Sequence, residues 1–304
     1  MENETAITYF LLLEFANNRH LQLLHFFFFL VLYLATITTN LLIISAVTLD
    51  HRLHSTMYFF LKNLSLLDLA IVSVIVPKSM INSLMNTRYI SYFGCVTQIF
   101  LFLSFGAADF FLLTVMAYDR YVAICHPLHY EIVMNRKTCI EIVILIWVIG
   151  FLYGMLHAIC IFSVVFCSNV VNQFFCDIPQ LLKLSCSSLN LCDIGVLLVG
   201  IIAGLGCFTF IVLSYAVIFK TVLRIPSEKG RQKTLSTCIP HLIVVSTLLL
   251  SGCFAYLRPP SNISSYLDFG LTVLYTILPP LFNPIIYSMR NNNIKCVLSQ
   301  LLGF

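Results

Sequence analysis

The stretch MAYDRYVAIC (residues 116–125) places an acid and a base side by side, Asp119 and Arg120, at the end of a long apolar run. A charge at membrane depth costs at least about 2.5 kcal/mol, so such residues usually pair or carry a function. The two side chains form either an interfacial anchor, in which the arginine extends toward lipid head groups, or an ion pair that a second conformation opens. The residue types alone leave both interpretations open.

Two further carboxylates, Asp68 and Asp109, lie near the middle of apolar segments, with no basic residue at the same depth. Asp109 precedes Arg120 by eleven residues, close to three helical turns, so the two share one helix face. Buried carboxylates without a basic partner must either share a proton or bind a cation. We therefore predict an interior polar cluster, as a protonated, hydrogen-bonded pair or as a cation site.

The other polar residues carry no enzyme signature, because the sequence has no metal-ligand spacing, Gly-rich phosphate loop or nucleophile motif. His157 and His241 are single histidines in apolar segments, and we interpret both as satisfied core residues. The basic residues are dispersed along the chain, so nucleic acid is not an expected partner.

Composition predicts the environment in which these residues act. The chain has 304 residues, 60% hydrophobic and 10% charged, against roughly 25% charged in ordinary soluble domains. Seven apolar runs are long enough to cross a bilayer, which takes about 20 residues, and helices satisfy every backbone polar group in lipid. The predicted spans are 25–49, 57–84, 95–125, 140–165, 194–223, 233–257 and 267–289.

Charge bias predicts the orientation. The loops after spans one, three and five, together with the tail, carry twelve of the 17 Lys and Arg residues, which favours those segments being cytoplasmic. The glycosylation sequon at Asn3, and a second at Asn262, then fall outside. So does a loop whose cysteines meet an oxidising compartment: Cys167, Cys176, Cys186 and Cys192. Their spacing lacks the tight pair of a zinc site, so no metal is expected.

These observations predict an all-α membrane protein, a seven-transmembrane helix bundle with its N-terminus outside and its C-terminus in the cytoplasm. Residues 1–304 form one domain, with 1–24 a short extracellular N-terminus and 290–304 a short cytoplasmic tail. The basic loop 220–233 either only sets the topology or also faces a protein partner and acidic membrane lipids.

Several segments together resemble one family. Seven spans, Cys95 opening span three, MAYDRYVAICHPLHY closing it and NPIIY (283–287) closing span seven resemble the rhodopsin-like G-protein-coupled receptors. The olfactory (odorant) receptor branch is indicated by LHSTMYFFLKNLSLLD (53–68), FFCDIPQLLKLSC (174–186), SYAVI (214–218), KTLSTCIPHL (233–242) and PPLFNPIIYSMRN (279–291). The resemblance implies a plasma-membrane protein of olfactory sensory cilia. It would bind small apolar volatile molecules and activate a stimulatory, olfactory-type heterotrimeric G protein that raises cyclic AMP.

The resemblance also implies roles for particular residues. Asp119 holds Arg120 at rest, and activation releases Arg120 toward the G protein. The other implied activation residues are Tyr215, Asn283, Pro284 and Tyr287. A sodium ion at Asp68 and Asp109 is implied, with Asn40 and Asn283 nearby. The implied disulfides are Cys95–Cys176 and Cys167–Cys186, which leave Cys192 over.

The implied odorant pocket lies one or two turns outward from Asp109. Its tentative lining is Phe102, Leu103, Gly106, Ala107, Cys253, Tyr256, Val273 and Thr276. This lining is apolar with one phenol and one hydroxyl, which suits a small hydrophobe with at most a weak polar group. A receptor for a peptide or an amine is the nearest alternative, and the absence of an acidic residue at this level disfavours amines.

Five positions depart from the family pattern. Thr39 replaces a usual Gly, Thr56 a usual Pro, and Asp109 the more common Glu. Leu248 and Leu249 stand where Phe-Tyr is usual, which removes a span-six tyrosine tied to activation and bears on signalling efficiency rather than on the fold.

Overall fold

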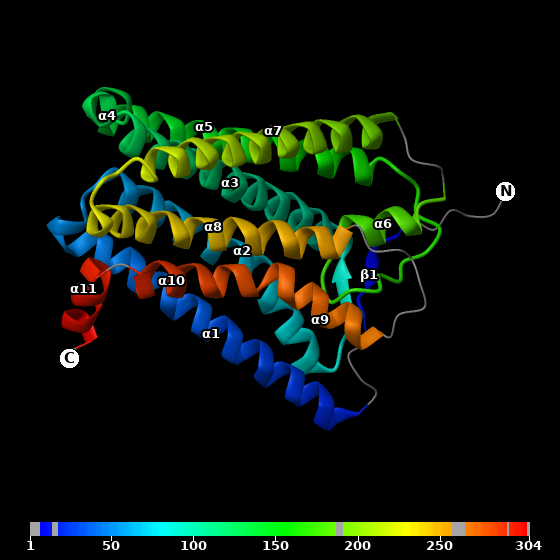
Figure 1. Cartoon of the computed structure of the whole chain (residues 1–304). Coiled ribbons are helices and arrows are strands. Elements are labelled where there is room, and N and C mark those ends of the chain that lie inside the picture. The colour runs from blue at the N-terminus through cyan, green and yellow to red at the C-terminus, as the bar shows by residue number, and fades with distance from the viewer. Residues whose placement is uncertain (1–6, 14–17, 187–190, 257–264, 291, 303–304) are drawn as a thin grey trace.

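The computed structural model describes residues 7–13, 18–186, 191–256, 265–290 and 292–302. Long helices lie side by side in a bundle, joined at one end by a loop-rich cap that contains a short sheet (Figure 1). The six long helices are α1 (Arg19–Leu49), α2 (Thr56–Met85), α3 (Tyr92–Cys125), α5 (Arg136–Phe162), α7 (Leu191–Val222) and α8 (Glu228–Tyr256).

These six helices are long and apolar enough to cross a membrane, and a bent pair brings the number to seven within the described chain. The prediction of seven helical spans is therefore confirmed. The helices extend beyond the predicted spans at several ends, because polar first turns such as Arg19–Gln22 continue the backbone hydrogen bonding outside the apolar run.

The seventh span is two helices, α9 (Ser265–Thr276) and α10 (Leu278–Arg290), rather than the single segment predicted. The apolar segments Phe269–Thr276 and Leu278–Ser288 are bent by 43° at this break. Pro279 and Pro280 follow at once, and each lacks an N–H and crowds the preceding turn, which breaks a helix. Further along α10, Pro284 has no N–H to give to the Pro280 carbonyl four residues earlier. That carbonyl instead accepts a hydrogen bond from Asn40 Nδ2 at 2.9 Å.

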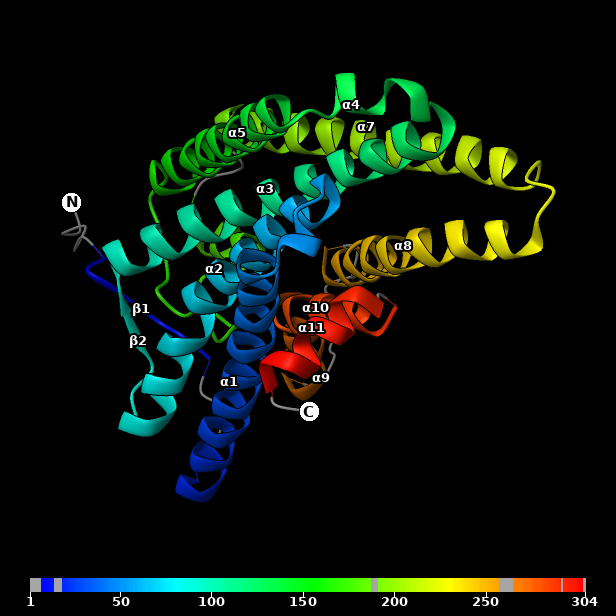
Figure 2. The same ribbon diagram turned by 90° about the vertical axis from the view of Figure 1, so that its left-hand side faces the viewer.

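Short elements cover the predicted extracellular end. Strand β1 (Tyr9–Leu11) pairs antiparallel with β2 (Tyr89–Ser91), with Tyr9 opposite Ser91, and the two lie side by side in Figure 2. Phe10 in the middle of β1 is fully buried, against Tyr92 and Phe166. The prediction of a purely helical chain thus missed a two-stranded sheet, whose three-residue strands are too short to give an alternating pattern. A short helix, α6 (Ile178–Leu184), lies in the loop after α5.

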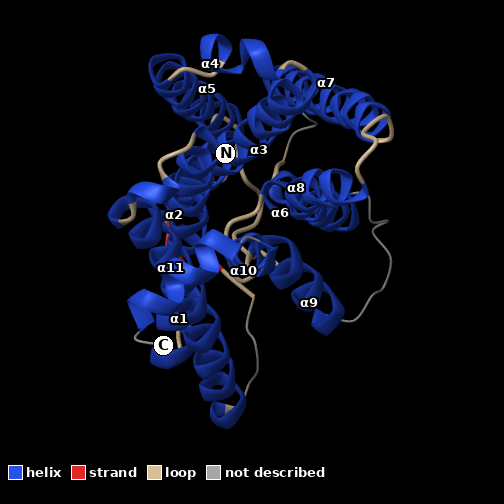
Figure 3. Cartoon of the chain, turned by 60° about the vertical axis from the view of Figure 1, so that its left-hand side comes forward, coloured by secondary structure: helices blue, strands red, loops and turns tan. Residues whose placement is uncertain are grey.

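The opposite end carries single-turn helices and a helical tail. These are η1 (His51–Leu53), η2 (Pro127–His129), α4 (Tyr130–Val133) and α11 (Asn292–Leu302). Helix α11 turns away from α10 at the end of the bundle (Figure 1) and lies close to α1 (Figure 3). Ile294 and Val297 are buried there, and the helix contacts α1 and η1. The tail predicted from sequence is therefore an ordered amphipathic helix.

Helix α3 is the centre of the bundle, in contact with α2, α5, α7 and α8. Its contact with α5 is close because Gly150 and Gly154, one turn apart, face α3 with no side chain between the backbones. A Cβ built on Gly150 would lie 2.5 Å from the Ser104 carbonyl oxygen. Small residues at this spacing let membrane helices approach, and here they fix the helix that carries most of the predicted site.

Candidate functional site

The acid–base pair at the end of α3 is held together and enclosed. Arg120 Nε lies 3.9 Å from Asp119 Oδ2, and the two side chains are 13% and 3% exposed. The other carboxylate oxygen, Asp119 Oδ1, accepts a 2.7 Å hydrogen bond from the Tyr130 hydroxyl. Both oxygens of Asp119 are therefore engaged and Arg120 is largely buried, which favours the ion-pair interpretation over an anchor that extends toward head groups.

Tyr130 is a site residue that the sequence analysis did not single out. It begins α4 in the loop after α3, eleven positions beyond Asp119. Burial raises the pKa of Tyr130, and the charge of Asp119 raises it further. The hydroxyl therefore keeps its proton at neutral pH and donates to the carboxylate. The only sequence signal for Tyr130 is that it ends the family-like segment MAYDRYVAICHPLHY.

A histidine joins three helices beside this pair. His241 on α8 contacts the Leu113 carbonyl oxygen of α3 through Nε2, and the Tyr215 hydroxyl of α7 through Nδ1, both at 2.9 Å. A carbonyl only accepts, so Nε2 carries the proton and Nδ1 of the neutral ring accepts from Tyr215. His241 is thus satisfied, as predicted, but it also ties α3, α7 and α8 together.

The two predicted partner tyrosines are near Arg120 and differ in their bonding. The charge of Arg120 acts on both Tyr215 and Tyr287. The Tyr215 hydroxyl is engaged by His241, whereas the buried Tyr287 hydroxyl has no hydrogen-bond partner among the described residues. In this conformation neither tyrosine bridges to Arg120, so that bridge stays a prediction about a second conformation.

The interior polar cluster links three helices. Asn283 Nδ2 of α10 lies 3.2 Å from each carboxylate oxygen of Asp68 on α2, and the charge of Asp109 on α3 acts on Asp68. Asn40 of α1 donates to carbonyl oxygens rather than to either carboxylate. Pro284 follows Asn283 inside α10 and removes one helical N–H, which loosens the turn that carries the asparagine.

Two oxygens of the residues predicted for the cation site lack hydrogen-bond partners within the described chain. Asp109 Oδ1 and Asn40 Oδ1 are buried and have no hydrogen-bond partner among the described residues. Unpaired buried oxygens are costly, and hard cations prefer carboxylate and amide oxygens. The described residues include no group of three His, Cys, Asp or Glu side chains placed to hold a metal, so a cation here would need the Asn40 amide.

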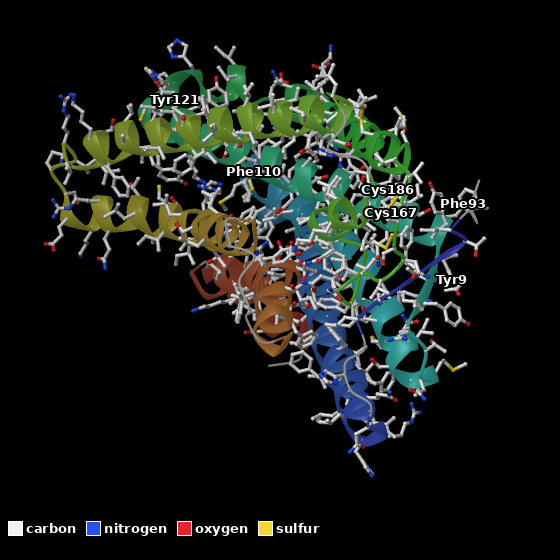
Figure 4. The ribbon with its side chains drawn as sticks, turned by 90° about the vertical axis from the view of Figure 1, so that its right-hand side faces the viewer. Tyr9, Phe93, Phe110, Tyr121, Cys167 and Cys186 are labelled. Atoms are coloured by element: carbon white, nitrogen blue, oxygen red, sulfur yellow. A yellow bond between two sulfur atoms is a disulfide. The ribbon has the colours of Figure 1, made fainter. Side chains whose placement is uncertain are left out.

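Three disulfides organise the outer loop. Cys95–Cys176 and Cys167–Cys186 are formed, with Cα–Cα distances of 5.6 and 5.0 Å, and the second is labelled in Figure 4. The expectation that Cys192 is left over is wrong, because Cys192 at the start of α7 bonds Cys160 near the end of α5. Sequence reasoning counted Cys160 as part of an apolar span, although it lies within the last turn of its helix.

The predicted odorant-pocket residues divide between two faces of α3. Phe102 and Val273 pack in one cluster around the buried loop residues Phe174 and Phe175, and the Phe102 and Phe175 ring centroids are 5.5 Å apart. Leu103 packs in a separate cluster around Cys95 and Cys176. The structure therefore brings Phe102 and Val273 together and directs Leu103 elsewhere.

Open space remains next to Gly106 of α3. A Cβ built on Gly106 meets no atom within 4 Å, and Ala107 beside it is only half-buried. Thr276 is buried, with its hydroxyl donating to the Thr272 carbonyl at 2.7 Å, so it offers a ligand only acceptor capacity. The side chains of Cys253 and Tyr256, and residues Asn3 and Asn262, lie outside the part of the chain that is described.

The outer loop forms the roof over these residues. Cys176 donates its N–H to Gln98 Oε1 at 2.8 Å, and Ser79 Oγ on α2 donates to the Phe174 carbonyl at 2.9 Å. Phe174 and Phe175 are thereby fixed, fully buried, under the outer end of the bundle. The loop segment 174–186 was quoted for its resemblance, but no role had been predicted for its aromatic pair.

Comparison with known proteins decides the family. The olfactory receptor family model matches residues 29–303 of the chain. The chain belongs to the olfactory receptor family. It is 48% identical to human olfactory receptor 14A16 over 99% of this chain and 98% of that protein, and 49% identical to human olfactory receptor 14J1 over 100% and 95%. The molecule is thus a multi-pass G-protein-coupled receptor of the odorant-detecting class and not an enzyme.

A buried carboxylate ties the roof of this receptor to its seventh span. Asp177, next to the Cys95–Cys176 bridge, accepts a hydrogen bond from the Tyr275 hydroxyl of α9 at 3.3 Å. Burial raises the pKa of Asp177 to about 6, although Tyr275 and the Ile178 N–H lower it. The raised pKa means that the folded receptor binds this proton more tightly than the unfolded chain, so ionisation above about pH 6 weakens the roof.

His157 departs from its prediction. Its Nε2 is buried and has no hydrogen-bond partner among the described residues, so the expectation of two satisfied core histidines is wrong for this nitrogen. Leu248 and Leu249, which replace the usual Phe-Tyr, pack against the main core cluster and so keep the α8 interface apolar.

Proposed function

We propose that this receptor binds small, mostly apolar volatile molecules between α3, α8 and α9 and activates a stimulatory, olfactory-type heterotrimeric G protein that raises cyclic AMP. The proposal includes the plasma membrane of sensory cilia as its location. The observation that carries it is the open space at Gly106, placed on the same helix as the Asp119–Arg120 pair. The apolar surroundings of Phe102 and Val273 favour hydrophobic ligands over peptides and amines.

A rigid helix joins the proposed pocket to the pair that faces the G protein. Gly106 precedes Arg120 by fourteen residues, about four turns or roughly 21 Å. Arg120 and its neighbours on α7 and α8 are tied through His241 to Leu113, which lies between them on α3. A ligand that binds one arrangement of α3 and α8 more tightly than the other would shift the equilibrium between the paired and released states of Arg120. The size of the shift equals the difference between the ligand's affinities for the two arrangements.

Replacing Gly106 with phenylalanine is expected to weaken the odorant response strongly while leaving the receptor at the surface. The backbone tolerates a side chain there, because no atom lies within 4 Å of the added Cβ, and the ring then occupies the ligand's volume. The measurement is a cyclic-AMP reporter screen against a panel of volatile compounds, in cells that supply the olfactory-type G protein. We expect a rightward shift of at least about tenfold, equal to 1.4 kcal/mol or more of lost binding energy.

Gly106→Ala serves as the matched control, because a methyl group leaves most of the space. An unchanged response of the phenylalanine variant would remove this pocket from the proposal. Stimulation of another G-protein class alone would overturn the cyclic-AMP coupling and leave odorant binding in place.

We propose further that Asp68, Asp109 and Asn40 hold a sodium ion in the resting receptor. Wild-type receptor is expected to unfold at a higher temperature in sodium chloride than in choline chloride, because the ion engages oxygens that otherwise lack partners. Asp68→Asn should remove most of that difference, while Asp50→Asn, outside the cluster, should retain it. An equal sodium effect in wild type and Asp68→Asn would contradict the ion site and favour a protonated carboxylate pair.

A further inference from the structure

A second cavity lies at the cytoplasmic end, far from the proposed odorant pocket. Its volume is about 550 Å³, and it lies between the end of α1, η1, the start of α2 and the start of α5. Its walls combine apolar and basic side chains: Val47, Phe59, His51, His54, Lys62 and Arg136. Neither Asp119 nor Arg120 lines it, so the cavity is separate from the pair that faces the G protein.

Lys62 is the most informative member of this cavity. It is half-buried and lies six residues into α2 from Thr56, about 9 Å along the helix. Ion pairs in the described chain join Arg52 to Asp50, Arg120 to Asp119 and Lys137 to Glu141, so Lys62 has no carboxylate partner there. An unpaired cation at the membrane edge is costly and attracts an anion or the interface itself.

Arg136 and two histidines line the same space. Arg136 likewise has no carboxylate partner among the described residues, and the Nδ1 atoms of His51 and His54 approach to 3.4 Å. Asp50, which adjoins His51 in sequence, already accepts the backbone N–H of Arg52 at 2.8 Å. The cavity therefore presents basic groups from α1–α2 and from α5 with no counter-charge of their own.

We propose that this cavity binds the phosphorylated headgroup of an inner-leaflet phosphoinositide. Basic pockets between helices on the cytoplasmic side recognise such headgroups. Lys62 and Arg136 are separate cations that can each serve a phosphate group, and the volume exceeds that of a single phosphate. Val47 and Phe59 add apolar surface to the cavity wall for the first part of an acyl chain, and a soluble phosphate would not use this surface.

A hydrogen bond connects the cavity to the second cytoplasmic loop, the loop after α3. Thr56 lines the cavity, and its hydroxyl donates to the Met134 carbonyl at 3.4 Å. Met134 closes the short helix α4, whose first residue, Tyr130, donates to Asp119. A bound lipid thus steadies the loop that holds Asp119, and its binding is expected to favour the resting pair.

The test uses purified full-length receptor in nanodiscs of neutral phosphatidylcholine, with and without phosphatidylinositol 4,5-bisphosphate. Native mass spectrometry counts the bound lipid, and the thermal unfolding midpoint reports its effect. We expect retention of the phosphoinositide by wild type, with an affinity lowered about fivefold by Lys62→Ala and again by Arg136→Ala. Lys62→Arg should restore binding, which separates a charge effect from misfolding.

Lys137→Ala is the matched control. Lys137 is the neighbour of Arg136, its side chain is 87% exposed and paired with Glu141, and it does not line the cavity. Equal losses in Lys62→Ala and Lys137→Ala would overturn the site in favour of unspecific attraction. Equal stabilisation by free inositol trisphosphate would overturn the lipid as the source, and equal retention of phosphatidylcholine would overturn phosphate recognition.

Discussion

Gly154→Val is expected to keep the receptor from reaching the cell surface. A Cβ at this position would lie 2.5 Å from the Phe100 carbonyl oxygen and 3.0 Å from the Ser104 nitrogen, and would also clash with Ser104 Oγ. The first two are backbone atoms of α3, so relief requires moving the central helix. Overpacking a core costs about 1–3 kcal/mol and occasionally more, a large share of a typical stability of 5–15 kcal/mol.

The measurement is surface staining of a tagged receptor together with the thermal unfolding midpoint of solubilised protein. Gly206→Val is the control, because Gly206 on α7 is exposed and an added Cβ meets nothing within 4 Å. Gly154→Ala should fall between the two. Normal surface levels of Gly154→Val would show that α5 does not pack on α3 through this glycine. The Gly150 and Gly154 spacing would then be free to serve contacts between receptors instead.

The spans were predictable because lipid leaves the backbone few choices. Long apolar runs can only be helices at membrane depth, and the charge bias orients them. The break between α9 and α10 also has a sequence signal, the adjacent Pro279 and Pro280. Hydropathy averages over such a break, whereas the missing N–H groups act on single turns. Hydropathy therefore predicts one continuous seventh span, whereas the two prolines indicate the break within it.

The site was predictable where two residues adjoin and unpredictable where the fold brings them together. Asp119 and Arg120 are neighbours in sequence, so an ion pair between them was one of the two interpretations that the sequence offered, and the structure contains it. The bond from Tyr130 depends on how the loop after α3 turns back. The Cys160–Cys192 bridge depends on the approach of α5 to α7, which cysteine spacing does not reveal. The aromatic roof likewise depends on where the Cys95–Cys176 bridge places the loop.

Arg120→Ala is expected to leave surface expression intact and to remove odorant-evoked cyclic AMP. Among the described residues, the only ion pair of Arg120 is the one with Asp119, at 3.9 Å. Asp119 keeps its hydrogen bond from Tyr130 when Arg120 is removed, so the fold is expected to hold. If the released guanidinium contacts the G protein, the active state loses its main polar partner. Coupling energies between receptor sites are typically 1–3 kcal/mol, so a loss on the order of a hundredfold in signalling potency is expected.

Tyr130→Phe tests the role of the Asp119–Arg120 pair through Asp119 instead of Arg120. The Tyr130 hydroxyl donates a 2.7 Å hydrogen bond to Asp119 and so supports the resting pair. Bonds to charged groups contribute about 1.5–3 kcal/mol, so removing this one should raise ligand-independent cyclic AMP by about tenfold or more. Cyclic-AMP levels normalised to surface expression give both readings in one assay. If Arg120→Ala signals fully, and Tyr130→Phe has unchanged basal activity, the pair is an interfacial anchor. If only Tyr130→Phe shows an effect, Asp119 acts through the loop rather than through Arg120.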